Sequence, residues 1–462
     1  MNPNSTRMPA EALEAFWRAK GRLEEPVQRF LRLEAAAGIV LLVMTAVAML
    51  WANLEPDGYR RFVHLPLQVG IGTWRLEGDL HFFVNEVLMS VFFLLVGLEI
   101  KREMVFGELS NVRRASLPVI AAMGGMVGPA LLFRAINASP PQSSGVAIPT
   151  ATDIAFAVGV LLLLGKRIPG SAQVFLLALA VADDLGAVAV INLFYSSDLR
   201  PRWLVLVAFA LIALWTFRLF GVRSWYAYLL PGVAMWIGFH HAHLHPTLAG
   251  VFMGLLIPVQ RSLEGSRFRQ EVRSLLAAGS DGGHDGQKKL AAEVVELAEE
   301  GALSPLERME MYVQPRVNFL ILPLFALVNG GVAVSFASLA SEGATRVALG
   351  VAFGLFVGKL VGIFGATMLA VRLNFVSWPD RMGPKQLLLV ALLGGIGFTM
   401  ANFTAELAFL GDANIPLRDA AKLGILAGSF ASGLCGYAYG KVFLREEEGA
   451  APPEIAEASD VL

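Results

Sequence analysis

Hydrophobic residues are distributed along this chain in long runs that short polar segments separate. A run of about 20 predominantly apolar residues is long enough for one helix to cross the hydrocarbon core of a bilayer. We therefore predict an all-α polytopic membrane protein with twelve transmembrane helices. The spans are expected at residues 34–52, 82–100, 115–136, 144–164, 171–195, 203–219, 225–239, 246–259, 317–334, 347–370, 386–410 and 422–443.

The segments outside these runs divide the chain into a membrane domain and its appendages. Residues 1–33 are polar and helix-like, so we expect a cytoplasmic N-terminal helix. The first span is already of spanning length and is expected to be an anchor, not a cleaved signal. The twelve-span domain should cover residues 34–444, with a cytoplasmic loop at 260–316 and a disordered acidic tail at 445–462.

Composition supports the membrane assignment and removes other classes of protein. Of the 462 residues, 55% are hydrophobic and only 16% are charged, which is too apolar for a soluble globular domain. The formal net charge of −1 gives no electrostatic basis for binding nucleic acid. Cys435 is the single cysteine, which excludes an internal disulfide and a cysteine-based metal or redox site.

Lysine and arginine are concentrated on one side of the predicted topology. With twelve spans, that side receives the N-terminal segment, the 260–316 loop, Lys101, Arg102 and the C-terminal Lys441. The positive-inside rule assigns this side to the cytoplasm. Both termini are therefore expected to be cytoplasmic.

The connection between the first two spans has the pattern of a β-hairpin. Residues 58–80 include a stretch with strand character, and Gly70 and Gly72 suit a tight turn. An isolated two-stranded hairpin is marginally stable in water, so it should pair with something. A second copy of the same chain is the simplest partner, which predicts a homodimer formed through this hairpin. An ordinary extracytoplasmic loop is the alternative.

Polar residues interrupt three of the predicted spans. The fifth span carries the adjacent Asp183 and Asp184, and one carboxylate at a span centre costs about 2.5–3.5 kcal/mol, so the pair should hold a cation or a proton. Pro149 and Asp153 interrupt the fourth span, and the glycine-rich stretch 394–402 interrupts the eleventh. Broken helices are tolerated at membrane depth around a cavity or under protein cover, so two breaks indicate a shared site. Two merely kinked helices are the alternative.

The tenth span contains a lysine, Lys359, on a helix whose glycines at 350, 354, 358 and 362 share one face. A lysine in lipid must find a carboxylate, and Asp153, Asp183 and Asp184 are the acids that we expect at its depth. A structural ion pair would explain Lys359 but cannot neutralise three acids. Adjacent helix positions point about 100° apart, so one of Asp183 and Asp184 should pair with Lys359 and the other should line an ion path.

Several segments carry a family resemblance. They are FFLLVGLEIKRE at 92–103, ATDIAFA at 151–157, LAVADDLG at 179–186, PTLAG at 246–250, Gly358-Lys359, GGIGFTM at 394–400 and AKLGILAG at 421–428. Together, and in this order, they resemble the NhaA-type sodium/proton antiporters. The resemblance implies that spans 3–5 and 10–12 are inverted repeats and that the two discontinuous helices, spans four and eleven, cross at mid-membrane.

The resemblance also assigns roles to the polar residues of the spans. It implies that Asp184 is the principal cation and proton carrier and that Asp183 is its neighbour and the partner of Lys359. Thr152 and Asp153 belong to the helix break and complete the cation- and proton-binding set. Lys359 serves in charge compensation, because it offsets the negative ends of half-helices while Asp153 offsets the positive ends.

A pH-responsive cytoplasmic surface is also implied by the resemblance. Its matching residues are Glu99, Glu103 and Glu310, and His245 matches a family histidine at the start of span eight. Members often place histidines just after the glutamate that Glu310 matches, whereas Met311 and Gln314 stand here. This chain therefore departs from the family pattern in the segment that bears on pH response.

Four histidines between His240 and His245 could in principle bind a metal such as zinc. A hydrated extracytoplasmic turn is the favoured interpretation, and we expect neither a bound metal nor a cofactor besides the transported sodium and protons. Gly358-Lys359 does not form a phosphate loop, because Leu360 stands where serine or threonine should follow. The spans contain no constellation typical of a membrane-embedded enzyme, so we expect no enzymatic activity.

The expected function is electrogenic exchange of cytoplasmic sodium, and also lithium, for external protons by alternating access. The expected location is a bacterial inner membrane, where such exchange regulates cytoplasmic pH and sodium. A cation channel is the alternative, and it would need a water-filled path open to both sides.

Overall fold

The structure is a computed structural model that describes residues 26–71, 74–195, 200–222, 224–259, 304–332, 343–379 and 382–444. Most of the expected N-terminal helix at 1–33, most of the 260–316 loop and the 445–462 tail lie outside the described residues. Within them, residues 26–33 already belong to the helix that forms the first span, α2.

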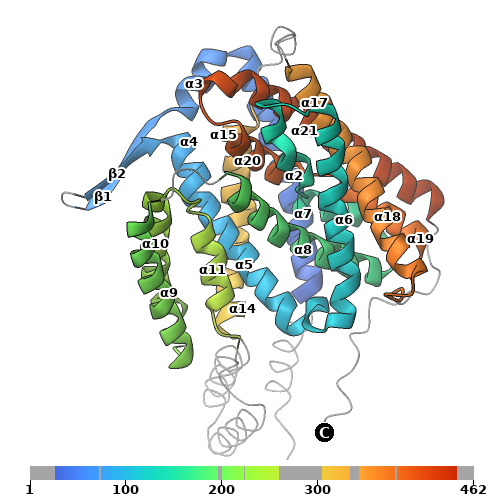
Figure 1. The fold of residues 1–462 in the computed structure, drawn as a ribbon, viewed down its shortest axis with the longest axis horizontal. Helices are drawn as coiled ribbons and strands as arrows, with labels where there is room; N and C mark the ends of the chain where they lie inside the picture. The colour runs from blue at the N-terminus through green and yellow to red at the C-terminus, as the bar shows by residue number, and fades with distance from the viewer. Residues whose placement is uncertain are drawn as a thin grey trace, which may run out of the picture.

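Helices make up almost all of the described chain (Figure 1). The α-helices are α2 (Pro26–Leu54), α3 (Pro56–Val63), α4 (Leu80–Phe82), α5 (Met89–Phe106), α6 (Val112–Ile136), α7 (Ile154–Leu163), α8 (Gly170–Tyr195), α9 (Leu204–Leu219), α10 (Trp225–Ala242), α11 (Leu248–Leu256), α14 (Pro305–Arg316), α15 (Leu322–Asn329), α17 (Ala344–Phe353), α18 (Lys359–Arg372), α19 (Pro384–Leu393), α20 (Phe398–Ala408) and α21 (Ile415–Phe443). Short 3₁₀ segments are η2 (Glu108–Ser110), η3 (Gln142–Thr150), η4 (Gly165–Arg167), η5 (Pro201–Trp203) and η9 (Asp412–Asn414), and π-helical turns are η1 (Phe83–Leu88), η7 (Val317–Ile321) and η8 (Gly354–Gly358).

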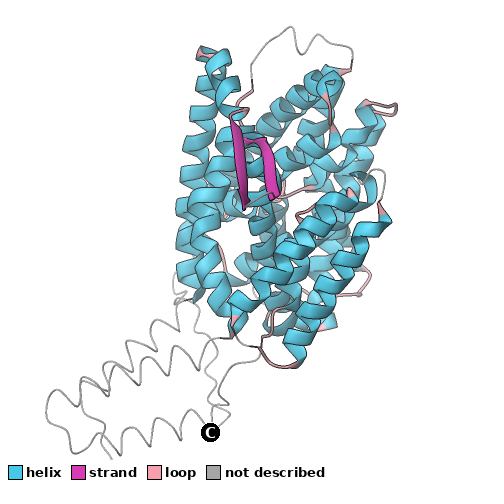
Figure 2. Cartoon of the chain, turned by 90° about the vertical axis from the view of Figure 1, so that its left-hand side faces the viewer, coloured by secondary structure: helices cyan, strands magenta, loops and turns pink. Residues whose placement is uncertain are grey.

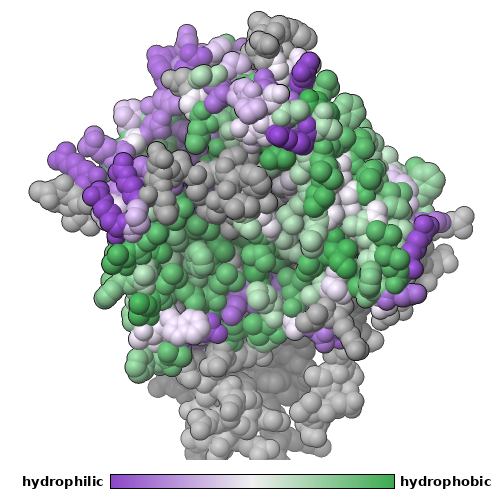
Figure 3. Space-filling model, viewed as in Figure 1, coloured by the Kyte–Doolittle hydropathy of each residue, from purple (hydrophilic) through white to green (hydrophobic). Residues whose placement is uncertain are grey.

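Among the described residues, 7 helices are long and apolar enough to cross a membrane, or up to 9 if each of two bent helix pairs is one span. These helices identify a multi-pass membrane protein. Apolar side chains also cover much of the surface in a space-filling view (Figure 3). The count of twelve and the inverted repeats stay predictions.

The two bent pairs are the helices that the sequence predicted to be broken. Segment η3 meets α7 at an angle of 44°, and α19 meets α20 at 47°. Pro149 lies inside η3, where it removes a backbone hydrogen-bond donor. Residues 394–397 separate α19 from α20 and include Gly394, Gly395 and Gly397, which weaken a continuous helix. Both predicted breaks are confirmed.

Close contact between α6 and α18 brings the tenth predicted span to these breaks. The two helices lie side by side in Figure 1. Gly358 is packed against α6 so closely that a Cβ atom on it would lie 2.6 Å from the Cα atom of Pro129. Glycine is therefore required there, which agrees with the small-residue face predicted for this span.

The predicted β-hairpin is present and projects from the helices (Figures 1 and 2). Strands β1 (Pro66–Ile71) and β2 (Trp74–Asp79) are antiparallel, with Pro66 opposite Asp79. The predicted boundaries at 58–80 were wrong at their start, because α3 occupies residues up to 63; Pro56 at its first position and Asp57 in its first turn favour a helix. Gly70 pairs with Arg75 inside the ladder and is not a turn residue.

Tyr59 fixes the base of the hairpin segment to the helices. Its hydroxyl donates to the carbonyl oxygens of Leu327 and Val328 at 2.8 Å and accepts from the Gly331 amide at 3.1 Å. Burial raises the pKa of Tyr59 to about 12, which keeps the hydroxyl protonated as a donor. Helix α3 is therefore anchored to α15 by hydrogen bonds.

Candidate ion-binding site

The two helix breaks contact each other directly. The Asp153 amide donates to the Ile396 carbonyl at 2.6 Å, and the Thr152 hydroxyl donates to the Gly394 carbonyl at 2.9 Å. All four residues lie in backbone that has left the helical hydrogen-bond pattern, although the Thr152 donor is its side-chain hydroxyl. Each break thus satisfies polar groups of the other, which is a requirement for non-helical backbone inside a bilayer.

Asp153 caps two helices at once. Its Oδ1 atom accepts from the Phe156 amide at 3.1 Å, at the start of α7. Its Oδ2 atom accepts from the Thr399 amide at 2.9 Å and from the Thr399 hydroxyl at 2.5 Å, at the start of α20. Helix starts carry partial positive charge and unpaired amide donors, so this carboxylate is held by the helices themselves.

Lys359 lies immediately after the π-helical turn η8 and is completely buried. Its ammonium group donates to an Asp183 carboxylate oxygen and, at 2.8 Å, to the Thr152 hydroxyl. Thr152 in turn donates to the carbonyl at the end of α19, so the lysine is linked to a negative helix end. The contact with Asp183 agrees with the pairing that the resemblance implies. The other Asp183 oxygen, Oδ1, is buried without a hydrogen-bond partner among the described residues.

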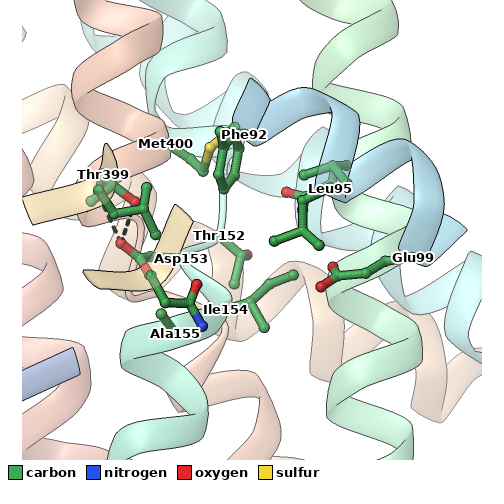
Figure 4. Close-up of a pocket in the computed structure, with 13 residues that line it drawn as sticks. Phe92, Leu95, Glu99, Thr152, Asp153, Ile154, Ala155, Thr399 and Met400 are labelled. Atoms are coloured by element: carbon green, nitrogen blue, oxygen red, sulfur yellow. Dashed lines mark hydrogen bonds between the residues drawn. The ribbon is translucent and has the colours of Figure 1, made fainter. Parts of the chain in front are cut away.

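Asp184 faces a different direction from its neighbour. It lines a cavity of about 40 Å³ together with Thr152, Asp153, Glu99 and Asn318, whereas Asp183 does not line it. Asp184 is only 3% exposed, and no hydrogen-bond donor in the described part of the chain contacts its carboxylate. Figure 4 shows the cavity between Asp153 with Thr399 on one side and Glu99 on the other.

This arrangement can hold a small cation or a proton. The cavity exceeds the roughly 10–15 Å³ that one water needs, so it has room for a dehydrated ion or a water beside it. The cavity offers carboxylate and hydroxyl oxygens, which hard cations prefer. Asp153, Asp183, Asp184 and Lys359, which we call the break cluster, combine three acids with one base. Burial disfavours uncompensated negative charge, so the cluster favours a bound cation or proton.

The residues assigned to pH response occupy several places. Glu99 lines the cavity. Glu310 is buried on α14 and accepts from Arg102 of α5 at 2.5 Å, while Glu103 accepts from the Glu108 amide at 3.0 Å. His245 lies in the turn before α11, where its carbonyl accepts from an amide of the same turn. The structure therefore brings Glu99 alone of these four to the cavity lining.

The neighbouring histidines contact aromatic rings. His240 stacks on Trp236 with ring centroids 5.3 Å apart, and His241 stacks on Trp203 at 4.4 Å. No group of three potential metal ligands is present among the described residues.

Sequence reasoning missed a second buried ionic cluster. Glu406, near the end of α20, contacts Lys422 at 2.6 Å, Arg418 at 3.1 Å and His81 at 3.4 Å. We call these four residues the Glu406 cluster. Asp419 also lies near its two α21 cations. Glu406 lies inside the predicted eleventh span, so an intramembrane acid was visible in the sequence, but its partners come from two other segments, α4 and α21.

Thr399 and Asn318 were also given no role from the sequence. Thr399 lies within the glycine-rich stretch that predicted the break, and the signal was a hydroxyl at the start of a half-helix. Asn318 begins a span and carries no distinguishing pattern.

Comparisons with known proteins agree over almost the whole chain. The family model described as Na+/H+ antiporter 1 matches residues 28–439. A Sorangium cellulosum protein named Na(+)/H(+) antiporter NhaA 2 is 44% identical over 99% of this chain and 97% of its own length. A Bordetella petrii protein named Na(+)/H(+) antiporter NhaA is 42% identical over 92% of each chain. A Myxococcus xanthus protein named Na(+)/H(+) antiporter NhaA 2 is 42% identical over 96% of this chain and 94% of its own length.

Proposed function

Because the chain belongs to the Na+/H+ antiporter 1 family, we propose that it exchanges sodium ions for protons at Asp184, with the rest of the break cluster holding that carboxylate in place. The family consists of transporters, and the chain is accordingly a transporter and not an enzyme.

The observation that carries this proposal is the different engagement of three buried acids. Asp153 caps α7 and α20, and Asp183 contacts Lys359. Asp184 lines the cavity without a hydrogen-bond donor among the described residues. A buried carboxylate in that state must bind a proton or a cation to be compensated. Sodium and protons therefore compete for the same oxygens.

Charge balance at the break cluster supports electrogenic exchange. Sodium binding at Asp184 can displace its proton, and a second proton can come from Asp183 or Lys359 once their contact opens. Two protons against one sodium ion would move net charge in each cycle. Alternating access would expose the cavity to one side of the membrane at a time. Thr152 and Asp153 would move together with the two helix breaks.

The arrangement of helices supports the proposed inverted repeats. In chain order, α6, the bent pair η3–α7, and α8 would correspond to the helix Ala344–Arg372 (α17, η8 and α18), the bent pair α19–α20, and α21. Each set thus has a bent pair between two long helices.

Under the positive-inside rule, the proposed orientation places both termini in the cytoplasm. The proposed location is the inner membrane of a bacterium. There the exchange would export sodium and lithium and regulate cytoplasmic pH, with Glu99, Glu103, Glu310 and His245 as the proposed pH-responsive residues.

A homodimer through the hairpin is part of the proposal. The sheet has two strands among the described residues, so each strand has an outer edge open to a partner strand. Deleting residues 65–77 should yield monomers that still exchange ions, because the break cluster lies within one chain. Mass measurement in detergent would test the oligomeric state of the deletion variant, and flux in vesicles would test its exchange. A persistent dimer would contradict the hairpin interface.

Flux in proteoliposomes tests the proposed function. An imposed sodium gradient should drive proton movement in the opposite direction, and membrane potential should accelerate it. The apparent sodium affinity should weaken about tenfold per pH unit for each proton that one sodium ion displaces, with a slope above one. Sodium flux that needs no proton counter-flux would instead identify a cation channel. A sodium affinity independent of pH would refute competition at one carboxylate.

A further inference from the structure

A second cavity lies beside the helix crossing and is separate from the ion site. It has a volume of about 330 Å³, and its lining shares no residue with the cavity at Asp184. Helices α2, α7 and α21 form its walls, and Ile396 and Phe398 at the second break complete the lining. We call this cavity the α21 groove.

The lining of the α21 groove selects an apolar occupant. Two of its three hydroxyl groups make hydrogen bonds within the protein: Thr45 donates to the Leu41 carbonyl at 2.8 Å, and Ser429 accepts from the Gly397 amide at 3.2 Å. The third belongs to Tyr437. The volume has room for several water molecules, but apolar cavities do not hold ordered water. Two lining residues, Leu163 and Phe430, are 70% and 73% exposed on the surface that faces lipid. A hydrocarbon chain fits this chemistry.

The length of the groove matches one leaflet of a bilayer. It follows α21 from Leu426 to Tyr437, which is about 16 Å at a rise of about 1.5 Å per residue. Half of a hydrocarbon core of about 30 Å is about 15 Å. An acyl chain that starts at the membrane surface near Tyr437 would therefore run past the second helix break, where the Gly397 amide donates to Ser429.

Basic side chains mark the surface end of the groove. The Lys441 ammonium lies 5.2 Å from the centroid of the Tyr437 ring, and Arg167 donates to the Lys441 carbonyl at 2.7 Å. In the proposed orientation this end faces the cytoplasmic leaflet, where anionic lipids are enriched. We infer that the α21 groove binds one acyl chain of an anionic phospholipid, with the phosphate beside Lys441 and Arg167. The inference rests on the proposed orientation and not on which ions are exchanged.

Lipid-dependent thermal unfolding of the full-length protein in detergent tests the headgroup site. Dioleoyl phosphatidylglycerol should raise the unfolding temperature at lower concentration than dioleoyl phosphatidylcholine, since the acyl chains are identical. Lys441→Gln should weaken the phosphatidylglycerol effect about fivefold and leave phosphatidylcholine unchanged. Arg372→Gln is the matched control, because Arg372 is an exposed arginine at the end of α18 that does not line the groove. Equal effects of the two lipids on the unaltered protein, or of the two substitutions, would overturn the inference.

Filling the groove tests the acyl-chain site. Gly433 lines it, and a Cβ atom there would make only ordinary contacts, at 3.5 Å or more. Gly433→Phe should place a ring in the cavity and abolish retention of phosphatidylglycerol in native mass spectrometry, whereas Gly433→Ala should retain it. If the phenylalanine variant does not fold, Gly433→Val should lower retention. Undiminished retention by a folded variant with a filled groove would refute the site.

Discussion

The helix breaks and the far end of α20 each hold a buried cluster of charged side chains, but their charges are compensated to different degrees. At the break cluster, three carboxylates share the single ammonium group of Lys359. In the Glu406 cluster, one carboxylate contacts Lys422 and Arg418, with His81 adjacent. Glu406 and Asp184 are almost equally buried, at 5% and 3% exposure. Burial alone therefore does not distinguish an ion site from a structural ion pair.

The sign of the imbalance makes the distinction. A carboxylate with several cationic partners gains little from binding sodium, and opening its contacts would leave buried charges unpaired. A carboxylate without a donor gains from either a proton or a sodium ion. We therefore propose a structural role for the Glu406 cluster, which joins α20 to α21 and to α4, alongside the proposed exchange role of Asp184.

Neutralising one acid in each cluster should produce the largest contrast. Asp184→Asn should abolish sodium-driven proton movement and leave the protein folded, because an amide cannot exchange a proton for a cation. Glu406→Gln should retain exchange at low temperature but lower the free energy of unfolding by about 3–5 kcal/mol, since it leaves buried cations unpaired. Flux in proteoliposomes and thermal unfolding in detergent measure the two effects. Full transport by Asp184→Asn would refute the assignment.

Removing the single base of the break cluster should have the next largest effect. Lys359→Ala leaves Asp183 without its partner and should lower the unfolding temperature, whereas Lys359→Arg keeps a cation and should retain stability and some exchange. The double variant Lys359→Ala with Asp183→Asn should recover much of the lost stability, because no charge is then left unpaired. Additive losses in the double variant would show that the two side chains are not energetically coupled.

The sequence was sufficient to predict the breaks because their causes are local. Pro149 and the glycines after Leu393 weaken helices wherever they stand, and both bends are present. The position of Lys359 within a span limited its candidate partners to the three acids expected at the same depth. The choice of Asp183 among them came from the family resemblance. The breaks and the set of three candidate acids thus needed only chain position and the cost of charge in lipid, whereas the choice of Asp183 needed the resemblance.

The features that could not be predicted depend on contacts between distant segments. Glu406 approaches His81 across more than 300 positions of sequence, and no pattern along the chain predicts that contact. Helix α3 was missed because the strand-like residues that follow it dominated the interpretation of 58–80. The separate directions of Asp183 and Asp184 were expected from helix geometry, but geometry alone did not say which one faces a cavity; the family resemblance pointed to Asp184, and Asp184 lines the cavity.

A smaller effect should follow from removing one of the donors that hold Asp153. Thr399→Val eliminates the hydroxyl bond to Oδ2 and leaves the amide bond of residue 399 in place. Hydrogen bonds to charged groups contribute about 1.5–3 kcal/mol, so we expect a lower unfolding temperature and slower exchange, not abolition. Thr399→Ser keeps the hydroxyl and is the control. Equal behaviour of the valine and serine variants would mean that the hydroxyl bond contributes nothing measurable.

The smallest effect on stability is expected at an exposed ion pair. It gives the lower limit for the contribution of a charged contact in this protein. At the base of the hairpin, Asp79 accepts from His64 at 2.7 Å and from the Phe82 amide at 2.8 Å. Partial burial acts to raise the pKa of Asp79, but these hydrogen bonds together hold it below its ordinary value. A depressed pKa contributes stability that is present above the unfolded-state pKa of about 3.9 and is lost as the pH falls below it. Exposed pairs of this kind contribute less than about 1 kcal/mol.

Hydrogen exchange of the β1 and β2 amides measures this contribution locally. In the unaltered protein, the amides should exchange faster relative to global opening at pH 3 than at pH 6, because below about pH 3.9 Asp79 binds a proton more readily in the opened hairpin base than in the closed one, which favours opening. Asp79→Asn should show the faster relative exchange at both pH values. Asp57→Asn, an exposed carboxylate in α3 whose side chain makes no hydrogen bond among the described residues, should behave like the unaltered protein. If Asp79→Asn keeps the pH dependence of the unaltered protein, another group titrates at the hairpin base, and the exposed pair contributes nothing to the attachment of the hairpin.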